Sequence, residues 1–333
     1  MNAIYMSGYG SDRMTIQGYS EGQSIPFWQD SPLSPSYFIF GDGFLFTAEE
    51  RSDGGAVCLY QKETDRWRQS DRRVITGSEL CHITYSDRHH CLLGACYGTG
   101  EVFSLSVDLD HARFGSMKSY LRQGKSGGNG MPISRAHCVV LNQEQNFVCS
   151  ANIAQDKIYL YRMESDGRLS EHNVFSLPAK CGPRHIALRE DLNRAYVVTE
   201  YSSEILVVSY ESSPSVLQRV AMVEKGFSGE SFGSTLVFSP DGKFLYAANR
   251  GENTIVAFSV SRTGRLVLSG RYSCWGNWPR DFSLIGEDQI AIANQRSGEV
   301  VICPRNPHTG AVGEPAYRFS IPEASCVKEY QGV

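Results

Sequence analysis

The chain has 333 residues, of which 41% are hydrophobic and 20% charged, values that are ordinary for a soluble globular protein. Its formal net charge is −4 without an acidic or basic tail, so the overall charge does not indicate nucleic-acid binding. No apolar run reaches the ~18 residues of a membrane span, and residues 1–14 do not resemble a secretory signal. We therefore expect a cytoplasmic protein that contacts neither nucleic acid nor membrane.

In chain order, residues 3–20 are interpreted as two or three strands. Six segments then follow one template: an apolar strand, a polar turn, a second apolar strand, a short polar loop and a third strand. These segments begin at Tyr37, Cys81, His137, Arg184, Ser234 and Arg280. Their starts are roughly 44 to 56 residues apart, which fits a four-stranded propeller blade.

The segment from Ser234 has the clearest hairpin turn, Ser-Pro-Asp-Gly at 239–242. Proline presets φ there, and Asp-Gly tolerates positive φ. Residues 108–130 are interpreted as an insertion whose glycine-rich end forms a mobile loop near a channel mouth.

Residues 316–330 predict one more strand. We expect the part near Tyr317–Ile321 to pair with the N-terminal strands and complete a seventh blade, because closure removes exposed sheet edges. The predicted fold class is therefore all-β, a single seven-bladed β-propeller of four-stranded antiparallel blades. This one domain would occupy residues 1–333.

The ten cysteines include no C-x-x-C pair and no metal-like spacing with histidine. We interpret most of them as small buried thiols and expect neither a metal ion nor another cofactor. The Gly229–Gly233 segment matches G-x-S-x-G, but a strand-like run follows it where a nucleophile elbow needs a helix. We interpret it as a loop between blades. His89 and His90 are expected in a solvated turn.

Three phrases resemble the seven-bladed lactonase family: GPRHIAL at 182–188, SPDGKFLYAANRGEN at 239–253 and NWPRDFSL at 277–284. That family contains the propeller-type 6-phosphogluconolactonases and the fungal-type carboxymuconate lactonizing enzymes. The resemblance implies an active site in the central channel that uses a histidine, arginines and a glutamate. Matching the motifs assigns these roles to His137, Arg184, Glu200, Arg250 and Arg280.

The repeat gives an independent reason to group these residues. One position begins the first strand of each repeat, and another follows about sixteen residues later, where the return strand ends. Both positions lie at the same end of a sheet, and equivalent positions from successive blades form rings around the channel. The first position is occupied by His137, Arg184 and Arg280. The second is occupied by Tyr97, Glu200, Arg250 and Gln295.

Three arginines and a histidine around one glutamate suit a small oxygen-rich anion, because arginine presents a planar donor fork to carboxylate or phosphate. The same arginines could instead brace the blades through buried hydrogen bonds. His82, His185 and Tyr97 fit either a ligand-binding or a scaffold role. For a lactone hydrolase, Glu200 or His137 could take the proton of water, and Arg184 or Arg250 could stabilise the oxyanion.

Three functions stay open on these grounds. The first is a metal-independent lactonase that acts on a small anionic metabolite, for example a phosphorylated sugar lactone such as 6-phosphogluconolactone. The second is a cycloisomerase that closes or opens a lactone on an unsaturated dicarboxylate, so that its ligand is a carboxylated lactone. The third is a non-catalytic propeller that binds a metabolite or a protein partner. The sequence predicts no oligomeric state.

Overall fold

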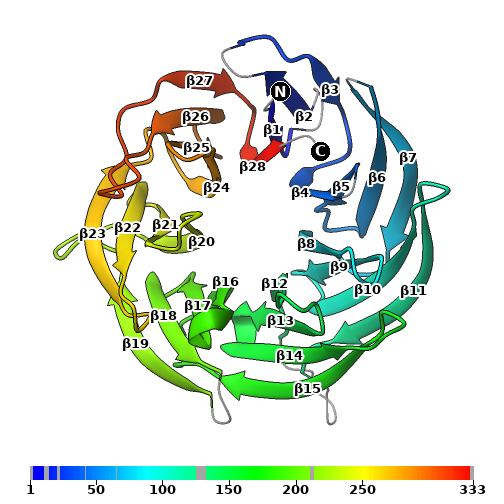
Figure 1. Cartoon of the computed structure of the whole chain (residues 1–333), viewed down its shortest axis with the longest axis horizontal. Helices are drawn as coiled ribbons and strands as arrows, with labels where there is room; N and C mark the ends of the chain where they lie inside the picture. Colours follow the sequence, from blue (N-terminus) through cyan, green and yellow to red (C-terminus); the bar gives the residue numbers. More distant parts are fainter. Residues whose placement is uncertain are drawn as a thin grey trace.

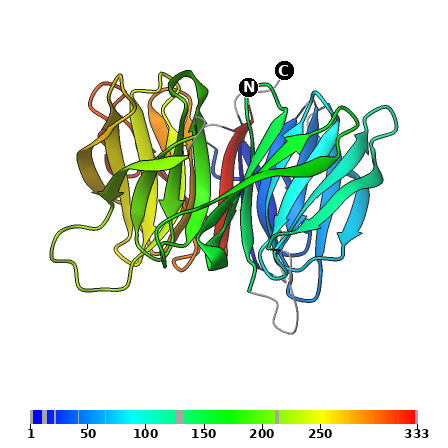
Figure 2. The same ribbon diagram turned by 90° about the horizontal axis from the view of Figure 1, so that it is seen from below.

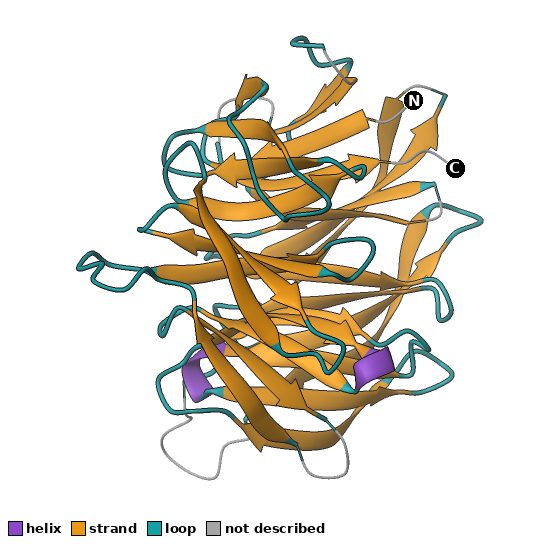
Figure 3. Ribbon diagram, turned by 60° about the vertical axis from the view of Figure 1, so that its left-hand side comes forward, coloured by secondary structure: helices purple, strands orange, loops and turns teal. Residues whose placement is uncertain are grey.

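The computed structural model describes residues 3–10, 15–20, 23–41, 43–64, 66–124, 133–210 and 214–330. In these residues, seven sheets of four antiparallel strands form a ring (Figure 1). Figure 2 shows the same ring from the side, with the blades standing next to one another. Helical structure in the described part is limited to two short 3₁₀ turns, η1 (Ile153–Gln155) and η2 (Glu190–Leu192) (Figure 3). The predicted seven-bladed propeller is confirmed.

We number the blades from the one that contains the N-terminus. Blade 1 consists of β28 (Ala324–Tyr330), β1 (Ala3–Gly8), β2 (Ile16–Ser20) and β3 (Trp28–Asp30). Blade 2 consists of β4 (Pro35–Gly41), β5 (Phe44–Glu49), β6 (Gly55–Glu63) and β7 (Arg66–Ile75). Blade 3 consists of β8 (Leu80–Ser86), β9 (Cys91–Cys96), β10 (Glu101–Asp108) and β11 (Arg113–Arg122). Blade 4 consists of β12 (Ala136–Leu141), β13 (Phe147–Asn152), β14 (Lys157–Met163) and β15 (Leu169–Ser176).

The remaining blades repeat this order. Blade 5 consists of β16 (Pro183–Arg189), β17 (Arg194–Thr199), β18 (Glu204–Ser209) and β19 (Ser215–Ala221). Blade 6 consists of β20 (Phe232–Phe238), β21 (Phe244–Arg250), β22 (Thr254–Val260) and β23 (Leu266–Ser273). Blade 7 consists of β24 (Pro279–Ile285), β25 (Gln289–Asn294), β26 (Glu299–Pro304) and β27 (Tyr317–Ser320). Within each blade, the first strand named is the innermost one.

The position of a strand in its blade decides its residue pattern. Every residue of β21 is buried, because both faces of a middle strand pack against neighbouring blades. The outer strand β19 is mostly exposed and mixes apolar with polar residues. The predicted turn at 239–242 joins β20 to β21, where Gly242 has φ +66° and its N–H donates to the carbonyl of Ser239 at 2.8 Å. None of the helical segments in the described residues has the length and apolarity needed to cross a bilayer.

Both termini contribute to blade 1, as expected, but the predicted closing strand is wrong. Residues Tyr317–Ser320 form β27, the outer strand of blade 7. The closing strand is β28, which pairs antiparallel with β1 and lies innermost in blade 1. The segment 316–330 therefore contains two strands, because the turn at Pro322 and Glu323, with φ +51° at Glu323, redirects the chain between blades.

The predicted insertion at 108–130 is also largely wrong. Residues Arg113–Arg122 form β11, the outer strand of blade 3, which pairs with β10 along most of its length. Its partly exposed outer position explains why its sequence lacks the apolar run that marks the middle strands. The glycine-rich end of the segment, residues 125–132, lies outside the described residues.

Candidate active site

Each innermost strand departs from regular antiparallel register near its first residues. A residue is skipped between Pro35 and Tyr37 in blade 2, for example, and between Pro183 and His185 in blade 5. Such a β-bulge re-aims a side chain and is common beside active sites. The residues at the bulges of blades 1 to 7 are Ser325, Ser36, Cys81, His137, Arg184, Ser234 and Arg280. We call this set the bulge ring.

A second ring follows the end of each second strand. The N–H of Glu200 donates to the carbonyl of Gly182 at 2.7 Å, and the N–H of Gln295 donates to the carbonyl of Trp278 at 3.0 Å. These bonds bring each second-ring residue beside the bulge of its own blade. The second-ring residues of blades 1 to 7 are Tyr9, Glu50, Tyr97, Ile153, Glu200, Arg250 and Gln295. The two predicted positions per repeat are therefore adjacent in every blade.

Glu200 lies between two arginines from neighbouring blades. Its Oε2 is 3.1 Å from Nε of Arg184 in blade 5 and 2.8 Å from a terminal guanidinium nitrogen of Arg250 in blade 6. Burial alone would raise the pKa of Glu200, but Arg250 and Arg184 outweigh it and hold that pKa below its usual range. The carboxylate is therefore ionised at neutral pH and firmly held.

The backbone fixes both arginines in place. A guanidinium nitrogen of Arg250 donates to the carbonyl of Gly233 at 3.0 Å, and Arg184 donates to the carbonyl of Ser234. Gly251 follows Arg250 with φ +92°, and a Cβ there would lie 2.0 Å from the carbonyl oxygen of Glu230, so only glycine fits. Burial lowers the pKa of Arg250 to about 10, with Arg184 adding to the effect and Glu200 opposing it. Arg250 still remains charged at neutral pH.

The three histidines lie together, from three neighbouring blades. The His137 and His185 rings have centroids 5.3 Å apart, and those of His82 and His185 are 5.1 Å apart. Burial, with a contribution from Arg184, lowers the pKa values of His137 and His185 well below their usual range, and burial lowers the pKa of His82 to about 3. All three are therefore neutral at pH 7.

The partners of these histidines separate His137 from the other two. His82 stacks on Tyr37 and accepts a hydrogen bond from the N–H of Val139 at 3.4 Å. Nδ1 of His185 lies 3.0 Å from the hydroxyl of Thr235. In contrast, Nδ1 of His137 is buried and has no hydrogen-bond partner among the described residues. His137 is therefore the histidine with a ring nitrogen available to a ligand.

A second carboxylate–arginine cluster was missed by the sequence analysis. Oε2 of Glu50 lies 3.1 Å from a guanidinium nitrogen of Arg280 and accepts a hydrogen bond from the Tyr9 hydroxyl at 2.5 Å. The Arg280 guanidinium is also 5.0 Å from the centre of the Tyr9 ring. Burial raises the pKa of Tyr9 well above its usual range, so this hydroxyl keeps its proton. Glu50 and Tyr9 occupy the same second-ring position as Glu200, so the repeat alignment could have identified both.

This second cluster changes the predicted charge of the site. Arg184, Arg250 and Arg280 face two carboxylates, Glu200 and Glu50, and not one as predicted. With the histidines neutral, one positive charge remains in excess. The site can still attract an anion, but less strongly than three arginines around one glutamate would.

The remaining predicted residues lie at the edge of these clusters. The Tyr97 and His137 rings meet edge to face, with their centroids 5.8 Å apart. The Tyr97 ring centroid lies 4.6 Å from Cζ of Arg135. Gln295 takes its expected backbone position, but its side chain makes no hydrogen bond to another described residue. The structure therefore brings Tyr97 into the site and leaves Gln295 on the second ring only.

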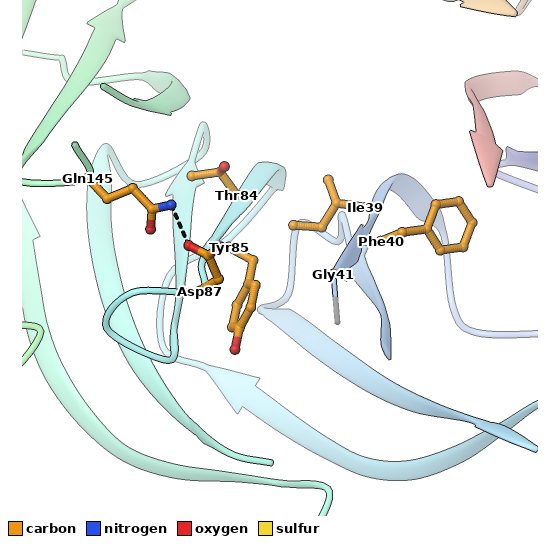
Figure 4. Close-up of a pocket in the computed structure, with 7 residues that line it drawn as sticks. All are labelled: Ile39, Phe40, Gly41, Thr84, Tyr85, Asp87 and Gln145. Atoms are coloured by element: carbon orange, nitrogen blue, oxygen red, sulfur yellow. Dashed lines mark hydrogen bonds between the residues drawn. The ribbon is translucent and has the colours of Figure 1, made fainter. Parts of the chain in front are cut away.

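A small central cavity is lined by one arginine of each cluster, Arg184 and Arg280. Its walls come from the innermost strands of five blades: Ser36, Tyr37, Cys81, Arg184, His185, Arg280, Asp281 and Ser325. A pocket at the far ends of β4 and β8 differs in character (Figure 4). There the Gln145 side chain donates to Asp87, and the seven lining residues include no cation. The bulge end is therefore the mouth that suits an anion.

Other candidate features prove structural. Ser231 of the G-x-S-x-G match lies in the loop before β20 and donates to the Asn249 side chain at 2.6 Å. His89 and His90 lie in the turn between β8 and β9. All ten cysteines lie in described residues and are free thiols, nine of them buried. Among the residues that the structure describes, no group of three His, Cys, Asp or Glu side chains could hold a metal ion.

Comparison with known proteins places the chain in a family. A 6-phosphogluconolactonase of Bacillus subtilis (strain 168) is 31% identical over 296 residues, or 85% of this chain and 83% of that protein. A periplasmic gluconolactonase of Pseudomonas aeruginosa superposes with a TM-score of 0.90 at 23% identity, covering 98% of both chains. A protein from Lactobacillus plantarum superposes with a TM-score of 0.88 at 22% identity, covering 99% of this chain and all of that one.

The two structural likenesses are too distant in sequence to show more than the shared fold. These relatives give no support to the cycloisomerase alternative. The sequence itself matches the family described as "Lactonase, 7-bladed beta-propeller" over residues 25–329. Because this match spans most of the chain, the protein belongs to the lactonase family of seven-bladed β-propellers.

Proposed function

We propose that this protein hydrolyses a small anionic sugar lactone, of the 6-phosphogluconolactone type, at the bulge end of the propeller and without a metal ion. The observation that carries the proposal is the Glu200 carboxylate held by Arg184 and Arg250, two arginines that also lie close enough to the neutral His137 to lower its pKa. The B. subtilis relative is named a 6-phosphogluconolactonase, which supports a phosphorylated sugar lactone as the substrate. The excess positive charge suits such an anion.

In the proposed mechanism, Glu200 is the general base. Water attacks the lactone carbonyl carbon, its proton moves to Glu200, and negative charge develops on the carbonyl oxygen. Arg184 and Arg250 are fixed by backbone carbonyls before substrate arrives, so they can stabilise this oxyanion without reorganising. The bond to the ring oxygen then breaks, and the proton on Glu200 passes to that oxygen. The product is an open-chain hydroxy acid.

His137 orients the water in this scheme. Its pKa lies well below neutrality, so it does not carry a positive charge that would compete with the arginines. Its unpartnered Nδ1 can form one hydrogen bond with the attacking water. Arg280, which is already paired with Glu50, binds the anionic part of the substrate.

A hydrolysis assay tests this function. The substrates are 6-phosphogluconolactone, unphosphorylated gluconolactone and muconolactone, each corrected for spontaneous hydrolysis with heat-denatured protein. We expect the largest kcat/KM for the phosphorylated lactone, and the same rate after exhaustive chelation. Equal rates on all three substrates would overturn the substrate class. Loss of activity on chelation, restored by one divalent ion, would overturn the metal-independent mechanism.

A further inference from the structure

A second cavity, of about 380 Å³, lies between blades 4 and 5 and away from the bulge ring. This volume is in the range of pockets that bind small molecules, roughly 300–1,000 Å³. Blade 4 contributes Phe147, Ile158, Leu160 and Phe175 to its wall, and blade 5 contributes Ile186 and Leu188. Phe147, Leu160, Phe175 and Leu188 are only half-buried. The wall is thus a largely apolar surface that the fold leaves partly open.

The repeat identifies the position that borders the cavity in blade 4. The residue four positions before each second-ring residue is equivalent in all seven blades. In blades 1 to 7 these residues are Tyr5, Phe46, Leu93, Cys149, Tyr196, Tyr246 and Ala291. Four of the seven are aromatic. Blade 4 has Cys149 at this position, and Cys149 lines the cavity.

The aromatic rings at this position fill the gap to the following blade. Tyr196 of blade 5 packs edge-on against Phe238 of blade 6 at 4.9 Å, and its hydroxyl donates to the carbonyl of Gly264 at 2.7 Å. Phe46 of blade 2 stacks on Tyr85 of blade 3 at 5.0 Å. Between blades 4 and 5, the much smaller Cys149 leaves this space unfilled. The cavity therefore lies where an aromatic ring packs at the junctions that follow blades 2 and 5.

The polar groups of the cavity define what else a ligand needs. The Tyr210 hydroxyl at the end of blade 5 is buried and has no hydrogen-bond partner among the described residues. An unmade hydrogen bond of a buried group is costly, so an acceptor on the ligand would be favoured here. The lining includes one carboxylate, Glu190, and no lysine or arginine. An anion, including the proposed substrate, would therefore be disfavoured.

From these observations we propose that the cavity between blades 4 and 5 binds a small uncharged aromatic molecule that carries one hydrogen-bond acceptor. The ring takes the space that an aromatic side chain takes at other blade junctions, beside Cys149. The acceptor receives the proton of the Tyr210 hydroxyl. This site is separate from the lactone site in both position and chemistry.

Acetophenone, an aromatic ring with one carbonyl acceptor, is a suitable probe, and ethylbenzene is its apolar counterpart. Ligand-observed saturation-transfer NMR and thermal unfolding would be measured on the full chain. We expect saturation transfer and a higher Tm with acetophenone, and a smaller effect with ethylbenzene. Tyr210→Phe should reduce the acetophenone effect to that of ethylbenzene. Tyr317→Phe, at an exposed tyrosine of blade 7, is the matched control. It should change neither the saturation transfer nor the Tm shift that acetophenone gives.

The substitution Cys149→Phe would place a phenylalanine ring of the protein itself in the cavity. We expect this variant to unfold at a Tm higher by about 2–4 °C, the shift that 1 kcal/mol gives in a large domain. It should also lose the acetophenone effect. If Cys149→Phe fails to fold, Cys149→Leu, the residue of blade 3 at this position, provides the same test with a smaller side chain. No binding to the wild type, or binding unchanged by these variants and by Tyr210→Phe, would overturn the proposal.

Discussion

Arg280 of blade 7 reaches across blade 1 to Glu50 of blade 2, with 3.1 Å between its guanidinium and the carboxylate. Both side chains are mostly buried, and Tyr9 of the intervening blade bonds to the same carboxylate oxygen. Burial alone would lower the pKa of Arg280, but Tyr9 and Glu50 raise it above its usual value. Arg280 thus pairs with a carboxylate two blades away, across blade 1, which is the blade that closes the ring.

Replacing Arg280 by alanine should mainly raise KM. The guanidinium would contact the anionic part of the substrate in both the ground and the transition state. We expect an increase of about 10- to 100-fold, from the ~1.5–3 kcal/mol of a hydrogen bond to a charged group. Arg318→Ala is the control, because Arg318 pairs with Glu299 on the outer part of the same blade. A fall in kcat at unchanged KM would assign Arg280 to the chemical step.

Replacing Glu200 by glutamine should lower kcat. Glutamine keeps the size and much of the hydrogen bonding of glutamate but cannot accept a proton from water. We expect kcat to fall roughly 10²–10⁴-fold, with KM little changed. Glu204→Gln, which disturbs an ion pair with Arg219 in the same blade, is the matched control. A folded Glu200→Gln protein with full kcat would give Glu200 a structural role and make His137 the leading base.

The pH dependence of kcat/KM separates these two bases. The arginines hold the pKa of Glu200 below its usual 4.5, so the ionised base should persist into more acidic solution. The pKa of His137 is lowered well below 6.5 by burial. We therefore expect no inflection between pH 5 and 8 in initial rates on unphosphorylated gluconolactone, which is used here because a phosphate ester titrates near pH 6 itself. An acid limb near pH 6.5 would show that a histidine with an ordinary pKa carries the reaction.

The same histidines should make the fold sensitive to acid. In the unfolded chain they bind protons near pH 6.5, whereas His82 has a pKa of about 3 in the folded protein, and those of His137 and His185 are also lowered. The unfolded state therefore binds more protons below pH 6.5, and the free energy of unfolding falls as the pH falls. Each histidine contributes about 1.4 kcal/mol per pH unit in this window.

Denaturant unfolding between pH 7 and 5 measures this effect. His82→Gln should reduce the slope of unfolding free energy against pH by about a third, since it removes one of the three buried histidines. Exposed His308→Gln is the control and should leave the slope unchanged. An identical slope in His82→Gln would mean that His82 is already protonated in the folded protein.

Removing β28 should open the ring. A chain that ends before Ala324 keeps β27 but leaves β1 without its inner partner, so a sheet edge becomes exposed. It also removes Lys328, whose ammonium pairs with Asp281 of blade 7 at 2.9 Å. We expect aggregation in light scattering and a lower Tm. If the truncated protein were monomeric and equally heat-resistant, β28 would not be needed for closure.

The sequence by itself determined the blade count, the innermost strands of six blades and two positions per blade that meet at one end of the ring. It could do so because each blade repeats one local pattern, and a hairpin places residues about sixteen apart side by side. Arg184 and Glu200, sixteen residues apart in blade 5, are neighbours for this reason. The outer strand β11 escaped prediction because a partly exposed strand has no apolar run to mark it.

Only the tertiary structure decided which side chains pair across blades. Glu50 and Arg280 are 230 residues apart, and no local pattern links them. Tyr317–Ser320 completes blade 7, and Ala324–Tyr330, not Tyr317–Ser320, closes blade 1. This assignment depends on where the chain turns from blade 7 into blade 1. Burial between blades keeps the three histidines neutral, and the cavity beside Cys149 likewise lies between two blades. Both depend on how the blades pack in the closed ring, which cannot be read from the sequence.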